Sequence, residues 1–197
     1  MTRTALPQAT TVEDPMTPVG ERLVETASRL FYAHGIRGVG VELIAEQAAT
    51  TKKTLYDRFG SKDALVSLYL RRRAARWQAF VLDHLAQHHP GAGPPRVLAV
   101  FDALDAWLSE QWRGCAFVNA YAEIGGTDHV AVPVVHAEKR WMRELFVALV
   151  VDAGIDDADR LGAQLHLLYE GAIVSVTAGD RADAVPVARQ AAERLLR

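Results

Sequence analysis

The sequence of 197 residues predicts an all-α protein of about nine helices. Its long segments repeat their apolar residues at three- and four-residue spacing, which is the period of an amphipathic helix. Alternating, strand-like runs bounded by hairpin signals are missing, and glycine, proline or capping residues separate the periodic segments. Half of the residues are hydrophobic, which is enough to form a core.

Four helices are predicted in the first half of the chain. Thr17 can cap the first, with Pro18 at its first helical position, and Gly35 ends it. Ser61, followed by an acidic residue in the first turn, caps a long fourth helix that ends at the breaker HPGAGPP, residues 89–95. The predicted ranges are 18–34, 41–48, 52–58 and 62 to about 88.

Five more helices are predicted after this breaker. Glycines end three of these helices, at Gly114, at the pair Gly125-Gly126 and at Gly154. A turn at Gly179 leads into the last helix. Asp156 can cap the eighth helix. The predicted ranges are 96–111, 116–124, 132–152, 156 to about 178, and 180 to about 195.

The chain is expected to divide into a tail, a head and a body. Residues 1–16 lack the apolar run of a secretory signal, and no later stretch reaches the roughly eighteen apolar residues of a membrane span. The single cysteine, Cys115, cannot form an intrachain disulfide, which favours the cytoplasm. We therefore expect a disordered tail over 1–16 of a soluble protein, followed by a head over 17–63 and a body over 64–197.

Charge separates the head from the body. Ten basic and six acidic residues lie between Thr17 and Arg73, whereas eleven basic and sixteen acidic residues follow Arg73. A basic head on an acidic body is typical of a protein that meets phosphate at one end and a different partner at the other.

The segment from Gly35 to Asp63 has the size and composition of a helix-turn-helix that reads the major groove of DNA. Its apolar residues can pack inward, and the helix over 52–58 then turns cations and hydroxyls outward, which suit phosphates and base edges. Thr51 can cap this helix, and Lys62 can hold the flanking backbone. The candidate inner residues are Ile36, Val41, Ile44, Ala45, Ala48, Leu55 and Phe59, and the candidate DNA-binding residues are Thr51, Lys52, Lys53, Thr54, Tyr56, Arg58 and Lys62.

These residues give the chain, from about Arg22 to Leu65, a resemblance to the N-terminal domain of the TetR family of bacterial transcriptional regulators. The similarity lies in LFYAHGIRGV (30–39), LIAEQA (43–48), TLYDRF (54–59) and SKDAL (61–65). The resemblance implies a three-helix helix-turn-helix DNA-binding domain over 17–63, a six-helix ligand-binding and dimerisation domain over 64–197, and a homodimer that releases its operator when a small molecule binds. The expected function is that of a ligand-responsive transcriptional regulator, with repression at a near-palindromic operator as its mode.

Three residues depart from the family pattern. Gly40 stands where a serine or threonine usually caps the second helix, and Lys53 replaces a small residue of the recognition helix. Ala49 replaces the usual turn glycine, so an alanine is expected to adopt a left-handed conformation.

Aromatic residues on the body helices can form the walls of a mostly apolar pocket, with a few polar groups to orient a ligand. The candidate ligand-binding residues are Trp107, Trp112, Phe117, Asn119, Tyr121, Glu123, His136, Trp141, His166, Tyr169 and Glu170.

The last two helices carry small residues among leucines and valines, a pattern that fits either an intrachain core or, as the resemblance implies, a four-helix dimer interface. The candidate interface residues are Leu161, Leu165, Leu168, Ala172, Val187, Ala191 and Leu195.

Enzymatic motifs are missing from the sequence: there is no G-x-S-x-G elbow and no G-x-x-x-x-G-K-[ST] loop. His84 and His88, at helical spacing, supply two metal ligands at most, whereas zinc takes three or four. We expect neither an enzyme nor a bound cofactor or metal. The alternative from another class is an all-α dimeric enzyme or small-molecule binding protein whose head does not engage DNA.

Overall fold

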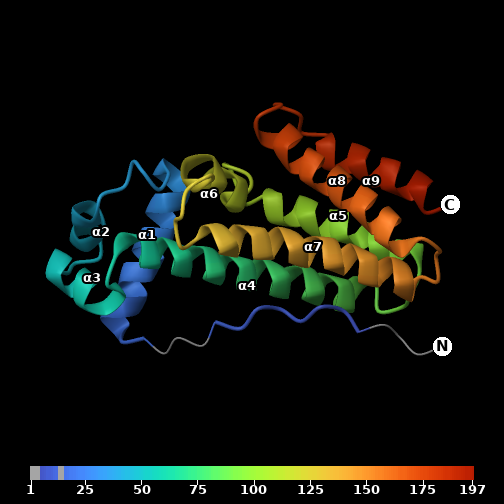
Figure 1. Cartoon of the computed structure of the whole chain (residues 1–197). Coiled ribbons are helices and arrows are strands. Elements are labelled where there is room, and N and C mark those ends of the chain that lie inside the picture. The colour runs from blue at the N-terminus through green and yellow to red at the C-terminus, as the bar shows by residue number, and fades with distance from the viewer. Residues whose placement is uncertain (1–4, 13–15) are drawn as a thin grey trace. The chain divides into compact units, whose positions relative to one another are not determined.

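A computed structural model describes residues 5–12 and 16–197, and in them it confirms the all-α prediction (Figure 1). These residues form nine helices and no strand. The helices are α1 (Pro18–His34), α2 (Val41–Gln47), α3 (Lys52–Phe59), α4 (Lys62–His88), α5 (Pro94–Leu108), α6 (Ala116–Ile124), α7 (Val132–Asp152), α8 (Ala158–Thr177) and α9 (Ala184–Leu195). Within the described ranges, none has a stretch of the length and apolarity needed to cross a bilayer.

Most helix ends follow the prediction because caps are local interactions, but α5 ends at Leu108 and not at Gln111, and α9 begins at Ala184, several residues after the predicted turn at Gly179. The Thr17 hydroxyl accepts a hydrogen bond from the Gly20 amide at 3.3 Å, and the Ser61 hydroxyl accepts one from the Ala64 amide at 3.0 Å. One cap was predicted wrongly: Asp157, in a left-handed conformation with φ 55°, precedes α8 in place of Asp156.

The chain packs as two compact units, each of which is described separately. The head unit comprises the described parts of residues 10–75 together with 116–137. The bundle unit comprises the described parts of residues 1–9 together with 76–115 and 138–197. This division differs from the expected boundary at residue 63, because α4 continues unbroken through it and α6 packs with the head.

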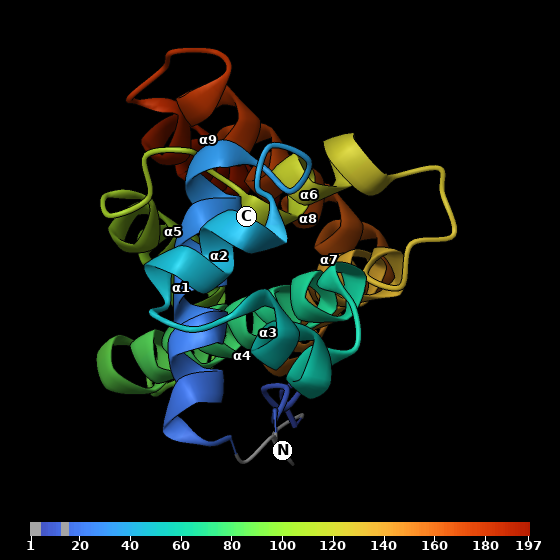
Figure 2. The ribbon, with the colours of Figure 1, turned by 90° about the vertical axis from the view of Figure 1, so that its left-hand side faces the viewer.

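In the head unit, α1, α2 and α3 pack against one another around a small core (Figure 2). Leu23, Ile44 and Leu55, one from each helix, are fully buried. The predicted inner residues are buried as well, except Phe59, which is partly buried. This packing leaves the remaining faces of the short helices in solvent.

The turn between α2 and α3 contains a strained residue. Ala49 has φ 50°, which confirms the left-handed conformation expected there. The Thr50 amide donates to the Ala45 carbonyl at 2.9 Å and closes the turn. For an alanine this conformation costs roughly 1–2 kcal/mol, because Cβ approaches the following carbonyl oxygen.

The carboxylate of Glu123, on α6, is bound to the backbone that follows α1. It accepts hydrogen bonds from the amides of Ile36 at 2.9 Å and Arg37 at 2.6 Å. Gly35 permits this approach, since a Cβ at its position would lie 2.7 Å from Glu123 Oε1. Lys62 Nζ donates to the Ile36 carbonyl at 2.6 Å. The backbone after α1 is therefore held by side chains from α4 and α6.

In the bundle unit, α9 packs against both α5 and α8, and α5 contacts α7 through aromatic rings. The rings of Phe101 on α5 and Phe146 on α7 lie 5.8 Å apart and are fully buried. At the edge of this core, Arg96 Nη1 lies 3.1 Å from Asp152 Oδ2, in an ion pair whose side chains are almost completely buried. Removing either partner of a pair at this depth would leave the other charge buried without compensation, which is strongly destabilising.

The N-terminal segment makes contacts that were not expected of a disordered tail. Trp141 Nε1 donates to the Gln8 carbonyl at 2.8 Å, and Leu6 packs against the core of the bundle unit. Gln8 thus supplies the acceptor that the N–H group of this buried tryptophan needs. The other parts of the expected tail, residues 1–4 and 13–15, lie outside the described residues.

Replacing Ala49 with glycine should stabilise the protein by about 1 kcal/mol, because glycine adopts a positive φ without the Cβ clash. Urea denaturation at constant pH measures the change. The matched control is Ala48→Gly, at a buried neighbour with φ −84°, and it should destabilise. Equal losses of stability in both variants would contradict strain at Ala49.

Removing the Glu123 carboxylate by Glu123→Ala should speed amide exchange at Ile36 and Arg37 roughly tenfold or more, since a hydrogen bond to a charged group contributes about 1.5–3 kcal/mol. Hydrogen–deuterium exchange resolved to single residues measures this. Glu144→Ala, at an exposed position of α7, should leave both amides unchanged. Unaltered exchange in Glu123→Ala would show that the two contacts do not hold this backbone.

Candidate nucleic-acid interface and ligand site

Helix α3 presents polar side chains to solvent. Leu55 is its one fully buried residue, Thr54 and Phe59 are partly buried, and Tyr56 is 40% exposed. The other residues of the helix, all exposed, are Lys52, Lys53, Asp57 and Arg58. The structure therefore brings most of the predicted DNA-binding residues to one exposed helix.

The N-terminus of α3 is capped as predicted. The Thr51 hydroxyl accepts a hydrogen bond from the Thr54 amide at 3.1 Å and lies 2.9 Å from the Thr54 hydroxyl. Helix α2, by contrast, begins after Gly40, which has no hydroxyl to offer. The positive end of the α3 dipole and two side-chain hydroxyls thus lie together at a place suited to an anion.

The two lysines of α3 are each paired with a carboxylate. Lys52 bonds to Glu42, which raises the pKa of the ammonium and lowers the pKa of the carboxyl. Lys53 Nζ lies 2.7 Å from Asp57 Oδ2, one turn along the helix. Exposed pairs of this kind contribute only about 0–1 kcal/mol, so phosphate oxygens can take the place of the carboxylates.

Lys62 was expected to bind the DNA backbone, but its ammonium is engaged within the head unit. Its ammonium bonds to the Ile36 carbonyl, is 6.0 Å from the centre of the Phe31 ring, and is partly buried. Because a buried carbonyl needs a donor, this lysine supports the framework of the head unit.

The eleven predicted ligand-binding residues are divided between the two units, so those of each unit are described separately. Trp112 is 71% exposed, and Trp141 binds the N-terminal segment. Glu123 is engaged by the backbone after α1, and Tyr121 lies beside His136 on the surface, their rings 5.6 Å apart. The residues that belong to the head unit are Phe117, Asn119, Tyr121, Glu123 and His136.

A charged cluster, which we define as Cys115, Glu138, Lys139, His166 and Glu170, does assemble in the bundle unit. Lys139 Nζ donates to both oxygens of Glu170, at 2.9 and 3.0 Å, and to Cys115 Sγ at 3.5 Å. His166 Nε2 lies 3.3 Å from Glu170 Oε1, and Glu138 Oε2 lies 3.7 Å from Lys139 Nζ. Two of the predicted ligand-binding residues, His166 and Glu170, thus share one site.

Aromatic rings extend from this cluster. Tyr169, which follows His166 on α8, is buried and stacks against Trp77 with ring centres 6.3 Å apart. Trp107 lies 5.4 Å from Trp77 and 5.2 Å from Phe80. The predicted Trp107 and Tyr169 therefore belong to the same region as the cluster.

Burial sets the protonation of the cluster. It raises the pKa of the Glu138 carboxyl, which the nearby Lys139 ammonium offsets only in part. Burial also opposes the charge on Glu170, but His166 and Lys139 outweigh it and lower the pKa of that carboxyl. For Lys139, burial favours the neutral amine, yet the surrounding negative groups outweigh it and raise the pKa of the ammonium.

Sequence reasoning missed Glu138, Lys139 and Trp77. A signal for Glu138 was available, because it falls at helical spacing between Val135 and Met142 on the buried stripe of α7. A carboxylate on an apolar stripe indicates a special environment.

On α8, the residues of the predicted dimer interface face the core of their own unit. Leu161, Leu165 and Ala172 point into the core of their own unit, with at most 8% of each residue exposed, and Leu168 also packs against that core. The same periodicity describes both faces of a helix, so spacing could not tell them apart. The apolar or small residues that the structure leaves exposed include Leu167, Gly171 and Val174 on α8 and Pro186, Val187 and Leu195 on α9, with Ala191 partly exposed.

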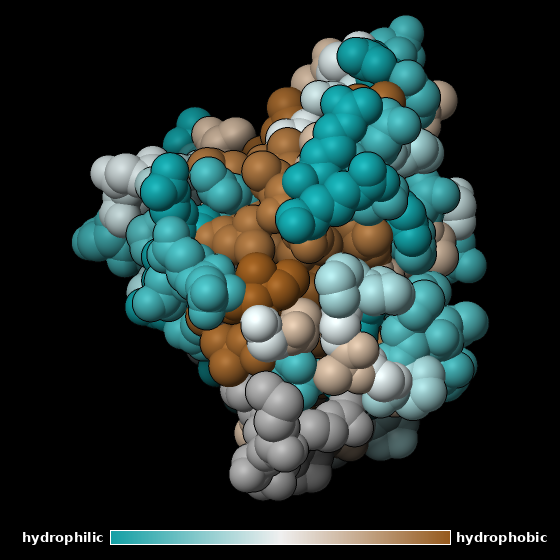
Figure 3. All heavy atoms as spheres, turned by 90° about the vertical axis from the view of Figure 1, so that its right-hand side faces the viewer, coloured by the Kyte–Doolittle hydropathy of each residue, from teal (hydrophilic) through white to brown (hydrophobic). Residues whose placement is uncertain are grey.

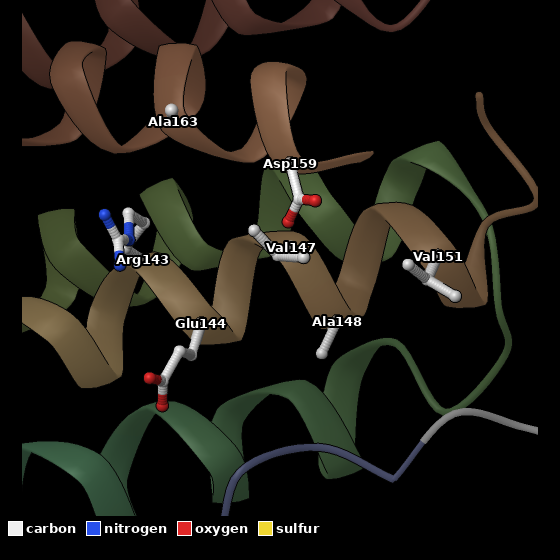
Figure 4. A pocket seen from close by; sticks show the side chains of 7 residues that line it. All are labelled: Arg143, Glu144, Val147, Ala148, Val151, Asp159 and Ala163. Carbon is white, nitrogen blue, oxygen red and sulfur yellow. The ribbon is translucent and has the colours of Figure 1, made fainter. Parts of the chain in front are cut away.

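A surface groove of about 500 Å³ lies between α7 and α8 (Figure 4). Its lining residues are Arg143, Glu144, Val147, Ala148, Val151, Asp159 and Ala163. None of the predicted ligand-binding residues is among them. Figure 3 shows the face of the molecule on the side where α9 ends. Apolar side chains gather on this face, and hydrophilic side chains surround them.

Comparisons with known proteins agree with this arrangement. Residues 23–68 match the family model described as bacterial regulatory proteins, tetR family. A TetR-family transcriptional regulator from Streptomyces coelicolor, SCO4454, is 31% identical over 92% of this chain and 89% of its own, with a TM-score of 0.84. A search of curated proteins found no match.

Two further crystal structures share the fold. A protein assigned to the same class, from Streptomyces avermitilis, is 28% identical over 90% of this chain and 99% of its own, with a TM-score of 0.74. NemR of Escherichia coli, in its reduced form, is 20% identical over 91% and 97%, with a TM-score of 0.76, and supports the fold alone. The exposed polar face of α3, the family match that contains it and the similarity along nearly the whole chain lead to one conclusion: this protein belongs to the TetR family of bacterial transcriptional regulators.

Proposed function

We propose that this DNA-binding regulator is a homodimeric repressor that leaves its operator when a small molecule binds the bundle unit. The observation that carries the proposal is the outer face of α3, where a capped N-terminus, two hydroxyls and three cations lie exposed together. Phosphate contacts by such groups position a protein on DNA, and an arginine can pair with guanine in the major groove.

Within this proposal the residues of α3 have different tasks. Thr51 and Thr54, at the helix N-terminus, are the groups best suited to a phosphate. Lys52 and Lys53 add charge that does not depend on sequence, and Tyr56 offers a hydroxyl beside them. Arg58 is the candidate for base readout.

The proposal of a homodimer is supported by the outward face of α8 and α9. Leu167 is 71% exposed and Gly171, one turn on, has open space above it, so a second helix can approach closely. Val187 and Leu195 supply apolar surface on α9. A two-fold pair would place two α3 helices about 34 Å apart, in successive major grooves of a near-palindromic site.

The alternative of an enzyme is set aside, because the regulators of this family are not enzymes. A small-molecule binding protein whose head does not engage DNA is a distinct outcome of the experiment that follows.

Fluorescence anisotropy with DNA from upstream of the protein's own gene should give tight binding that weakens steeply with salt, because bound phosphates release counterions. Lys53→Ala should weaken binding to every sequence and reduce the salt slope by about one unit for each α3 helix. Arg58→Ala should instead reduce discrimination between matched and mismatched sites, by about 1–3 kcal/mol.

The control for both variants is Arg140→Ala, which removes an exposed cation of the bundle unit and should leave affinity and salt slope unchanged. If the three variants bind alike, the assigned roles are wrong. Absence of salt-dependent binding to any upstream fragment would favour the binding protein.

Leu167→Glu should convert the dimer to a monomer and abolish high-affinity operator binding, because a carboxylate would be buried at the pairing face of α8. Analytical ultracentrifugation measures the mass, and circular dichroism verifies that the helices persist. Val130→Glu, at a position 58% exposed outside α8 and α9, should remain dimeric. If Leu167→Glu stays dimeric and keeps its operator affinity, the dimer interface must lie elsewhere.

A further inference from the structure

Glu138 is a carboxylic acid in an unusual position. Its side chain is 2% exposed, and Oε2 accepts no hydrogen bond from any described residue. Buried polar atoms in native proteins nearly always have a partner, so one without a partner indicates a missing water, ion or ligand. The unsatisfied oxygen of Glu138 therefore marks a place where a donor can bind.

The charges around Glu138 show which kind of donor is missing. Among the described residues, Lys139 is the one ammonium near it, and that ammonium already binds both oxygens of Glu170 and the sulfur of Cys115. Two carboxylates thus share one fixed cation. His166 Nε2 lies 3.3 Å from Glu170 Oε1. A second positive charge would balance the group.

The surroundings favour an organic cation over a metal ion. The hydroxyl-bearing ring of Tyr169 is buried beside the cluster and stacks on Trp77, which continues to Trp107. Aromatic faces attract cations and accept apolar groups. No group of three possible metal ligands occurs anywhere in the described ranges.

The cluster also has an open side and a closed side. The side chains of Lys139 and Glu170 are each 23% exposed, whereas that of Glu138 is almost inaccessible. A ligand entering beside Lys139 and Glu170 would meet Glu138 last. Its charged end would then be the part held most deeply.

We propose that Glu138 recognises the protonated amine of an aromatic amine, and that such amines are the effector class of this regulator. This inference rests on the proposed effector response of the bundle unit. The amine forms an ion pair with Glu138, its aromatic part lies against Tyr169 and Trp77, and Lys139 stays bound to Glu170.

Proton linkage follows from this arrangement. Burial raises the pKa of the Glu138 carboxyl, so the ligand-free protein holds a proton there more readily than the unfolded chain does. Stability due to this group is present at low pH and is lost as pH rises through the folded pKa. An amine needs the carboxylate, so its binding should tighten over the same rise in pH while the amine stays protonated.

Thermal shift with two matched series tests the proposal: tryptamine, tryptophol and indole-3-acetate, and phenethylamine, 2-phenylethanol and phenylacetate. Within each series only the charge at the end of the side chain differs. The amines should raise the Tm of the wild-type protein by a few degrees, and the alcohols and acids should not. Equal responses within both series, or no response to either amine, would overturn the proposal.

Two variants locate the effect. Glu138→Gln keeps the size of the side chain and should abolish the amine shift, whereas Glu144→Gln, at an exposed position of the same helix, should retain it. Without ligand, Glu138→Gln should melt higher than the wild type at pH 8.5 and by a smaller margin at pH 5.5. A wild-type amine shift that persists in Glu138→Gln, or equal melting of the two proteins at both pH values, would also overturn the proposal.

Operator release, measured by anisotropy with the same six compounds, separates this inference from the proposed function. Amines that shift Tm through Glu138 but leave the operator bound would contradict the effector response and support the amine site. If the protein binds its operator but none of the six compounds shifts its Tm, the amine site is contradicted and the proposed DNA-binding function is not.

Discussion

The DNA-binding surface proposed for this regulator depends on α3, a helix that is too short to be stable by itself. Helix α3 is eight residues long and buries a single side chain completely, that of Leu55. A helix this short is not stable alone, because nucleation costs more than so few hydrogen bonds return. Its position is therefore imposed by its N-cap and by its packing against α1 and α2.

Two charged side chains of the head unit also serve its framework. Lys62 and Glu123 bind opposite poles of the backbone near Ile36, one its carbonyl and the other its amide. Both residues had been assigned to ligands by their chemistry, Lys62 to phosphate and Glu123 to an effector. A backbone turn offers the same partners as a ligand does, an acceptor for a cation and donors for an anion.

The bundle unit, in contrast to the head unit, holds charged side chains inside an apolar core. Arg96 and Asp152 form a buried pair of opposite charges, and that pair has a structural role. The charged cluster leaves one carboxylate oxygen, Glu138 Oε2, without a hydrogen-bond partner among the described residues, and such an arrangement costs stability unless something else binds there. The two sites lie in the same unit, yet only the unbalanced one suggests a function.

The sequence alone determined the all-α fold, all nine helices of the described residues and the face of α3 turned to solvent, because periodicity, caps and breakers are local properties. It also located the strain at Ala49. Only the tertiary structure decided which face of α8 is free, whether Glu123 meets a ligand or an amide, and that Glu138 lies beside Lys139 and Glu170. Those outcomes depend on contacts between residues distant in sequence, and helical spacing carries no information about which neighbour a face will meet.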